Sequence, residues 1–262
     1  MGIVNVTPDS FSGDGLARDL GRAEEQALQM LADGADLIDI GGESSRPGAA
    51  PVSAQEEIDR VLPLLERLCN LPVPISVDTC KAPVMRAALA GGAALINDIN
   101  ALQAEDAVDT LAGVNAAVCI MHMQGEPRSM QNAPRYLNVV EDIKGFLQQR
   151  IAVANQAGIG HERICVDPGF CFGKALNHNL ALLKNLRLFS DLGCTLLVGL
   201  SRKSMLGQIT GRAVADRIVA SVAAALMAVE AGARIVRVHD VAATRDAFAI
   251  WQAINEQGQD HD

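Results

Sequence analysis

The sequence is poor in aromatic residues, which make up 3% of its 262 residues, although 49% of the residues are hydrophobic. The core of such a chain must therefore be aliphatic, which is typical of parallel strands that are buried on both faces. No apolar run approaches the roughly 18–20 residues that span a bilayer, so we expect no membrane segment. The first residues, MGIVNVTPDS, have no basic start and no apolar leader, so we expect no secretory signal.

Basic residues are also in deficit, with 22 Lys and Arg against 31 Asp and Glu and a formal net charge of −9. This balance argues against nucleic acid or an anionic membrane as a partner, so any cationic site must be local. The six cysteines show no Cys-x-x-Cys spacing, and we expect them to be reduced, buried thiols of a cytoplasmic protein. The five histidines are scattered, which disfavours a histidine-ligated metal.

Short apolar runs alternate with longer amphipathic stretches along the whole chain, and no linker or long charge block divides it. The runs predict eight strands at Gly2–Val6, Asp36–Ile40, Pro74–Asp78, Ala94–Asn97, Ala116–Met121, Ile164–Asp167, Thr195–Gly199 and Arg234–Val238. The amphipathic stretches, such as Leu20–Asp33, Ala54–Cys69 and Val139–Ala157, predict helices. Three helices are predicted to end at a glycine that leads straight into a strand, at Gly34, Gly92 and Gly232.

Alternating strands and helices are typical of either a closed barrel or a doubly wound sheet. Eight strand–helix units with no leftover segment favour the barrel, and the length is close to the roughly 250 residues of one such barrel. The sequence therefore predicts an α/β protein whose residues 1–262 form a single (β/α)8 TIM-barrel domain.

Polar residues stand at the C-terminal end of almost every predicted strand. One aspartate in such a place could simply cap the following helix. The strand ends converge on one face of a barrel, however, and that face carries the active sites of barrel enzymes. The same placement on eight strands favours an active site.

Asp78, Asp167 and Asn97 form a first set of polar residues, near the barrel axis. Buried carboxylates are costly unless they are paired, and we expect Lys203 to be the partner when no ligand is bound. The set suits a ligand edge with alternating donors and acceptors, such as a 2-amino-4-oxopyrimidine. The carboxylates would also stabilise positive charge that develops on that ligand.

Arg46, Arg237 and His239 form a second set, of the anion-binding type. A guanidinium group suits a phosphate better than a lysine does, and Ser204 is predicted to open a helix near this set. His239 alone could be a core histidine, but it alternates with Arg237 on one strand, so both side chains should point the same way. Lys203 as a Schiff-base lysine is disfavoured, because barrel aldolases usually carry that lysine within the strand.

Eight motifs resemble those of the dihydropteroate synthase family, in the family's order and over nearly the whole chain. They are MGIVNVTPDSFS, GGESSRPGA, ISVDTCK, INDI, MHMQGEP, VDPGFCFGK, GLSRKSMLG and RVHDV. Related pterin-binding methyltransferases share the barrel but lack the SRKS and RVHDV pair. The resemblance implies an enzyme of folate synthesis and a target of sulfonamides. It would join 6-hydroxymethyl-7,8-dihydropterin diphosphate to 4-aminobenzoate with Mg²⁺ and release pyrophosphate.

The resemblance also implies a role for each matching residue. The pterin would be held by Asp78, Asn97, Asp167 and Lys203. The diphosphate would be held by Asn5, Arg46, Arg237 and His239, with Asn5 contacting the magnesium ion. The aminobenzoate site would be lined by Ser45, Pro47, Phe172 and Ser204.

The mechanism that the resemblance implies is SN1-like. Diphosphate would leave first, helped by magnesium and by Arg46, Arg237 and His239, and the arylamine would attack the resulting cation. Asp78 and Asp167 would stabilise that cation, and with Lys203 these residues form the expected catalytic group. A homodimer through the late helices is expected from the resemblance alone.

Four single positions depart from the family pattern, and the first loop reads SGDG at residues 12–15 where SDGG is common. Ser45 stands where Thr is usual, Cys80 and Ala82 replace Ser and Pro, and Cys171 replaces Gly. None of them removes a ligand residue, so the expected function is unchanged.

Two other functions compete with this one. A methyltetrahydrofolate-dependent methyltransferase would need no cationic cluster, so Arg46, Arg237 and His239 argue against it. A pterin carrier without activity would be expected to lack at least one member of the two sets, and none is missing.

Overall fold

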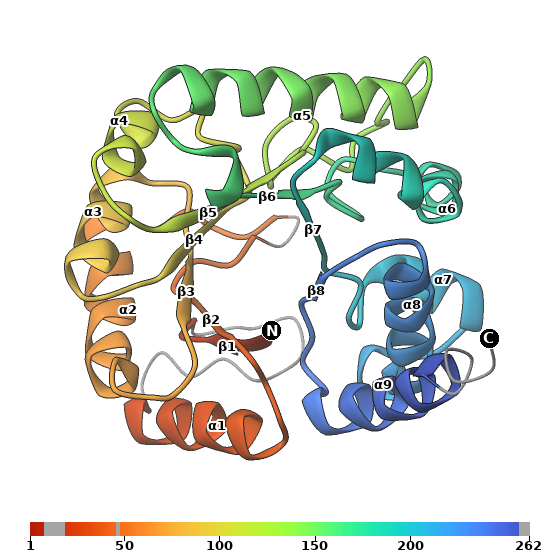
Figure 1. The fold of residues 1–262 in the computed structure, drawn as a ribbon, viewed down its shortest axis with the longest axis horizontal. Coiled ribbons are helices and arrows are strands. Elements are labelled where there is room, and N and C mark those ends of the chain that lie inside the picture. Colours follow the sequence, from red (N-terminus) through yellow and green to blue (C-terminus); the bar gives the residue numbers. More distant parts are fainter. Residues whose placement is uncertain (8–18, 46–47, 257–262) are drawn as a thin grey trace.

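A computed structural model describes residues 1–7, 19–45 and 48–256 of the chain. Its strands are β1 (Gly2–Asn5), β2 (Ile38–Gly41), β3 (Ile75–Asp78), β4 (Leu95–Asp98), β5 (Ala117–Met121), β6 (Ile164–Asp167), β7 (Thr195–Val198) and β8 (Ile235–Val236). These strands are parallel, and they pair in the order in which they occur along the chain (Figure 1).

The sheet closes on itself where β8 meets β1. Val238 forms a parallel bridge with Gly2, its backbone N donates to Met1 O over 2.9 Å, and Ile3 N donates to Val238 O over 3.1 Å. The predicted (β/α)8 barrel is therefore confirmed, and the ends of all eight strands lie within two residues of their predicted places.

β8 is shorter than predicted because β7 and β1 pair with different parts of the predicted segment. Pairing with β7 ends at Val236, opposite Val198, where β7 itself ends. Val238 then pairs with β1, and Arg237 lies between the two contacts.

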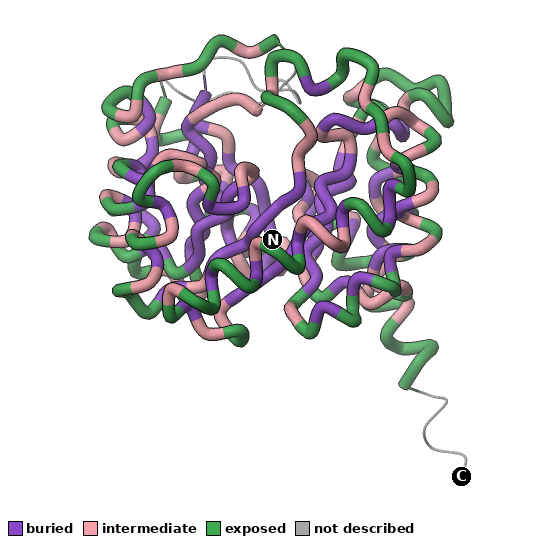
Figure 2. The backbone as a smooth tube through the Cα atoms, turned by 90° about the horizontal axis from the view of Figure 1, so that it is seen from above, coloured by how far each residue is buried: buried purple, intermediate pink, exposed green. Residues whose placement is uncertain are grey.

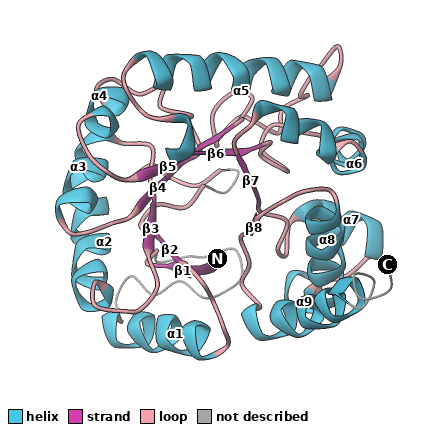
Figure 3. Ribbon diagram, viewed as in Figure 1, coloured by secondary structure: helices cyan, strands magenta, loops and turns pink. Residues whose placement is uncertain are grey.

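Helices form a ring around the strands (Figure 3). They are α1 (Leu20–Ala32), α2 (Ala54–Leu68), α3 (Ala82–Ala90), α4 (Ala107–Ala112), α5 (Val139–Gln156), α6 (Leu176–Lys184), α7 (Ser204–Thr210), α8 (Ile218–Glu230) and α9 (Val241–Glu256). The predicted glycine turns are confirmed, since the backbone of Gly34 and Gly92 has φ +91° and +95° at the end of α1 and α3. Among the described residues, no helix combines the length and the apolar content that a membrane crossing needs.

The large aliphatic core lies between the strands and the helices, and the buried segments occupy the centre of the molecule (Figure 2). A second, smaller cluster of buried apolar residues contains Met1, Leu95, Cys119, Cys165 and Leu197. Side chains alternate between the two faces of a strand. Residues two positions apart on a strand therefore share a face. On β4, β5 and β6, the residues two positions after Leu95, Cys119 and Cys165 are Asn97, Met121 and Asp167.

The strand register brings polar residues of neighbouring strands level with one another. Asn5 is level with Gly41, Gly41 with Asp78, and Asp78 with Asn97. A Cβ atom at Gly41 would lie 3.6 Å from Asn5 Oδ1 and 3.8 Å from Asp78 Cβ, so the missing side chain leaves room between these two residues.

Candidate active site

A cavity of about 450 Å³ opens at the C-terminal ends of the strands. Its lining includes ten of the twelve residues that the sequence predicted for the site, Asn5, Ser45, Asp78, Asn97, Asp167, Phe172, Lys203, Ser204, Arg237 and His239. The other two, Arg46 and Pro47, lie outside the described residues. The described members of the two predicted polar sets thus line one cavity.

Arg237 connects these residues, because its guanidinium group makes two ion pairs across the barrel. Nε donates to Asp39 Oδ2 over 2.6 Å, and Nη2 donates to Asp78 Oδ2 over 2.9 Å. Burial alone would lower the pKa of Arg237, but the charges of Asp39 and Asp78 raise it above its usual value. The arginine therefore stays charged while it is largely enclosed.

Asp39 was not among the predicted site residues. Its side chain is fully buried, and its Oδ2 accepts from both Arg237 and Asn97 Nδ2, the latter over 3.3 Å. Its Oδ1 has no hydrogen-bond partner among the described residues. The sequence does carry a signal for it, because a lone carboxylate interrupts the apolar run of a predicted strand that is buried on both faces.

The expected pairing of the carboxylates with Lys203 is wrong for Asp78, whose partner is Arg237. Within the described part of the chain, no ion pair within 4 Å joins Lys203 to a carboxylate. The ammonium group of Lys203 instead donates to Phe170 O over 2.7 Å and lies 4.8 Å from the centre of the Phe172 ring. The guanidinium is the better partner because it bonds two carboxylates at once from β8.

The pKa of Asp78 is raised to about 7, mainly by burial, with the charge of Arg237 opposing the shift and that of Asp39 adding to it. Burial also raises the pKa of Asp167, and the charge of Lys203 and a hydrogen bond from Gly169 N over 2.7 Å oppose it. The ionised form of both carboxylates is therefore destabilised in the ligand-free site, and a cationic ligand would stabilise it.

His239 is fixed by Ser201, which the sequence pattern did not single out. The Ser201 hydroxyl lies 2.9 Å from His239 Nδ1 and accepts from His239 N over 3.1 Å. Next to this pair, Arg202 makes an ion pair with Asp240, with Nε 3.0 Å from Oδ2. The two contacts join the loop after β7 to the loop after β8, so Lys203 and His239 are held in a fixed relation.

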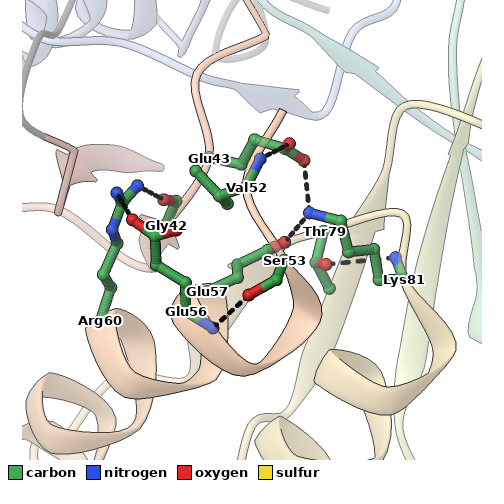
Figure 4. Close-up of polar contacts among 9 residues, drawn as sticks. All are labelled: Gly42, Glu43, Val52, Ser53, Glu56, Glu57, Arg60, Thr79 and Lys81. Carbon is green, nitrogen blue, oxygen red and sulfur yellow. Dashed lines mark hydrogen bonds and ion pairs between the residues drawn. The ribbon is translucent and has the colours of Figure 1, made fainter. Parts of the chain in front are cut away.

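The loop after β2, which leads to Ser45, is held at both ends by Glu43 (Figure 4). Glu43 Oε1 accepts from Val52 N over 3.0 Å, and its Oε2 accepts from Lys81 Nζ over 2.8 Å. Lys81 also donates to the buried Glu57 Oε2 over 2.6 Å. A second cavity of about 320 Å³ adjoins this network and shares Glu43 and Asp78 with the first.

The side-chain oxygen of Asn5 is a candidate ligand for a metal ion in this cavity. Within the ranges that the structure describes, no group of three or more His, Cys, Asp or Glu side chains is arranged to hold a metal ion. Asn5 Oδ1 lines the cavity beside the gap at Gly41. A neutral oxygen of this kind suits Mg²⁺, which keeps several waters and takes further oxygens from substrate phosphates.

The sequence pattern of the family described as "Pterin binding enzyme" matches residues 1–239 of the chain. A dihydropteroate synthase of Haemophilus influenzae is 52% identical over 254 residues, which cover 97% of this chain and 92% of that protein. The chain belongs to the dihydropteroate synthase family of pterin-binding enzymes.

Solved structures of other members of the family have the same fold. The Yersinia pestis dihydropteroate synthase, solved as a sulfonamide drug complex, superposes with a TM-score of 0.95 at 47% identity and covers 98% of this chain and 93% of its own. The enzyme of Xanthomonas albilineans in complex with 7,8-dihydropteroate superposes with a TM-score of 0.87 at 45% identity, over 97% of this chain and 92% of its own. The chain is thus a transferase of this family with a complete barrel.

One departure from the dihydropteroate synthase pattern has a structural consequence. Cys171 has φ +66° and lines the cavity. Glycine, the usual residue of the family at this position, adopts that conformation without strain, whereas for a cysteine it costs about 1–2 kcal/mol. Cys80 is half-buried, and burial raises the pKa of its thiol to about 12, so it stays protonated.

The buried ion pair between Asp39 and Arg237 predicts that replacing Asp39 lowers the stability of the protein. Asp39→Asn keeps the shape but removes a charge that faces Arg237, and it should lower the free energy of unfolding by about 3 kcal/mol. Asp36→Asn is the control, because Asp36 is 81% exposed and lies 3.5 Å from Arg245, and it should change stability by less than about 1 kcal/mol. Urea unfolding of both variants measures the difference, and equal effects would contradict a central role for Asp39.

Proposed function

We propose that the chain catalyses the reaction of dihydropteroate synthase. It joins 6-hydroxymethyl-7,8-dihydropterin diphosphate to 4-aminobenzoate, gives 7,8-dihydropteroate and releases pyrophosphate. The observation that carries the proposal is the meeting, in one cavity, of buried carboxylates with Arg237, Lys203 and His239. Such a cavity suits a substrate that has a polar heterocycle at one end and a diphosphate at the other.

The pterin end is assigned to Asp78, Asn97, Asp167 and Lys203. Ionised carboxylates accept hydrogen bonds, a lysine donates, and the asparagine amide does both. This combination matches the amino, imino and oxo groups of the heterocycle. Asp167 is 4% exposed and Asn97 5%, so the heterocycle would lie in the enclosed part of the cavity.

The diphosphate end is assigned to Arg237, His239 and Asn5. A guanidinium has five N–H donors, and the bonds to Asp39 and Asp78 use two of them. His239 is oriented by Ser201, which keeps the ring in place at the end of β8. Arg46, which lies outside the described residues, stays a prediction for this end.

The aminobenzoate end is assigned to Phe172, Ser204 and Ser45, which line the same cavity. The Phe172 ring offers an apolar face to a benzene ring, and the Ser204 hydroxyl at the start of α7 can donate to a carboxylate. Pro47, outside the described residues, stays a prediction here as well.

These assignments support an SN1-like mechanism. The bond between the pterin methylene carbon and the diphosphate oxygen breaks, and the electron pair leaves with the pyrophosphate. Asp78 and Asp167 stabilise the positive charge that spreads over the pterin, which is the largest catalytic contribution in such a site. The amine nitrogen then attacks the methylene carbon and loses one proton to solvent. Mg²⁺ would be held by Asn5 Oδ1 and the diphosphate, and it would neutralise charge on the leaving group.

The function is tested by measuring pyrophosphate release with purified protein. We expect release coupled to 7,8-dihydropteroate formation when the pterin diphosphate, 4-aminobenzoate and Mg²⁺ are all present, and removal of Mg²⁺ with a chelator should abolish it. Chromatography of the same reactions should show 7,8-dihydropteroate in equal amount. Pterin binding without any pyrophosphate release, or release without 7,8-dihydropteroate when aminobenzoate is present, would contradict the proposal.

Replacing an aspartate with asparagine removes its charge and keeps its shape, so the effect of the charge alone can be measured. Asp167→Asn should fold but lower kcat by about 100-fold, or ~3 kcal/mol, because the group opposing the cation becomes neutral. Asp98→Asn is a matched control, because Asp98 is a buried aspartate at the end of β4 that caps the backbone of Asn100 and Leu102 and does not line the cavity. Steady-state kinetics of both variants check this, and a kcat of Asp167→Asn close to that of the unmodified chain would refute the electrostatic role.

We also propose that the protein is a cytoplasmic homodimer. The six cysteines all have free thiols, which is typical of a reducing compartment. The expectation that they are all buried is wrong, because only Cys119 and Cys165 are buried and Cys69 is exposed. On α8, Val219 is 82% and Met227 56% exposed, which supports an interface on this late helix. Sedimentation velocity at micromolar concentration tests the dimer, and a single monomeric species would contradict it.

A further inference from the structure

Lys174 is a buried lysine that none of the roles above uses. It follows β6 in the motif VDPGFCFGK, its residue is 2% exposed, and it does not line the cavity. Its ammonium group donates to Phe172 O over 2.9 Å and to His122 O over 3.3 Å, and it lies 3.0 Å from His122 Nδ1. A lysine ammonium has three protons, so these three acceptors satisfy it completely.

The contact with His122 is consistent with a neutral imidazole that accepts from the lysine. Burial and, to a smaller extent, the charge of Lys174 lower the pKa of His122 to about 3. Burial likewise lowers the pKa of Lys174 to about 7, against the charge of Asp167. The ring of His122 is also packed edge-on against Phe146, with 5.0 Å between the ring centres, so the acceptor is held in place.

Lys174 therefore joins the loop after β6 to the end of β5, where the two backbones already lie against each other. Gly169 has φ +72°, and a Cβ atom there would lie 1.9 Å from His122 O. A Cβ atom at Gly173 would lie 2.5 Å from Gln124 O. Only a chain without side chains at these two positions can pass so close to the segment after β5.

Two lysines hold alternate carbonyl groups of this loop. Lys203, from the loop after β7, donates to Phe170 O, and Lys174, which is anchored on His122, donates to Phe172 O. Between these carbonyls lies Cys171, in its strained conformation with φ +66°. The Phe172 ring lines the cavity with Lys203 Nζ 4.8 Å from its centre. The direction of this ring thus depends on a backbone that the two lysines fix.

We propose that Lys174 is a positioning residue for the second substrate, because it fixes the Phe172 carbonyl and so holds the Phe172 ring where an aromatic amine packs against it. The inference rests on the proposed function. It holds that Lys174 supports the binding of aminobenzoate and not the binding of the pterin. It predicts that the loss of Lys174 acts through Phe172 and raises the KM for one substrate only.

The test is a double-mutant cycle with Lys174→Met and Phe172→Ala, read by pyrophosphate release with each substrate varied in turn. Lys174→Met keeps an unbranched apolar stem but removes the donor. It should raise the KM for aminobenzoate about tenfold, as expected for a displaced apolar contact, and leave the KM for the pterin diphosphate nearly unchanged. In the Phe172→Ala background, Lys174→Met should have little further effect on either KM.

Tyr136→Phe is the matched control, because the Tyr136 hydroxyl donates to the neighbouring Gly173 O over 2.8 Å in the same loop. It should leave both KM values close to those of the unmodified chain. If Lys174→Met does not fold, Lys174→Gln takes its place in the cycle, since its amide retains a donor one atom closer to the backbone. It should then show a smaller rise in the KM for aminobenzoate.

Three results would overturn the inference. They are an unchanged KM for aminobenzoate in the Lys174 variant, equal rises in both KM values, and additive effects of the two substitutions in the cycle. Failure of the proposed function looks different, because the unmodified chain would then release no pyrophosphate from the two substrates.

Discussion

The site depends on one interaction, the pairing of Arg237 with Asp39 and Asp78. Each of the three groups would be costly to bury alone, and together they form a connected unit with N–O distances of 2.6 and 2.9 Å. The unit connects β8 to β2 and β3 across β1, at the point where the barrel closes. The barrel closure and the binding site therefore share the same side chains, and a change in either one affects the other.

Much of the fold could be predicted from the sequence because strand and helix periods differ so clearly. The helix predicted at Ala54–Cys69 ends one residue earlier, at Leu68, and the strand predicted at Ile164–Asp167 is identical to β6. Polar residues at strand ends could be found for the same reason, since an Asp or Asn that interrupts an apolar run is conspicuous. Arg237 and His239 line the cavity together, as their alternation predicted.

The partners of these residues could not be predicted, because they depend on which strands face each other across the barrel. Asp39 and Arg237 are 198 positions apart in the chain, and nothing local in either segment indicates the contact. The sequence therefore suggests Lys203 for a role that belongs to Arg237. Lys174 could not be predicted for a related reason. Its three acceptors are two backbone carbonyls and the ring of His122, which follows β5, and such contacts leave no pattern in the sequence.

The balance of charge explains why a site of this kind suits a reaction that develops a cation. Asp39, Asp78 and Asp167 place three carboxylates around Arg237 and Lys203. Burial and the charge of Asp39 raise the pKa of Asp78 to about 7. The ionisation of Asp78 is therefore disfavoured in the ligand-free site. Positive charge on a bound pterin lowers the pKa of Asp78. The anionic carboxylate, which is destabilised before the reaction, is therefore stabilised during it. The carboxylates thus bind the developing cation more strongly than the neutral substrate, which is the difference that accelerates the reaction.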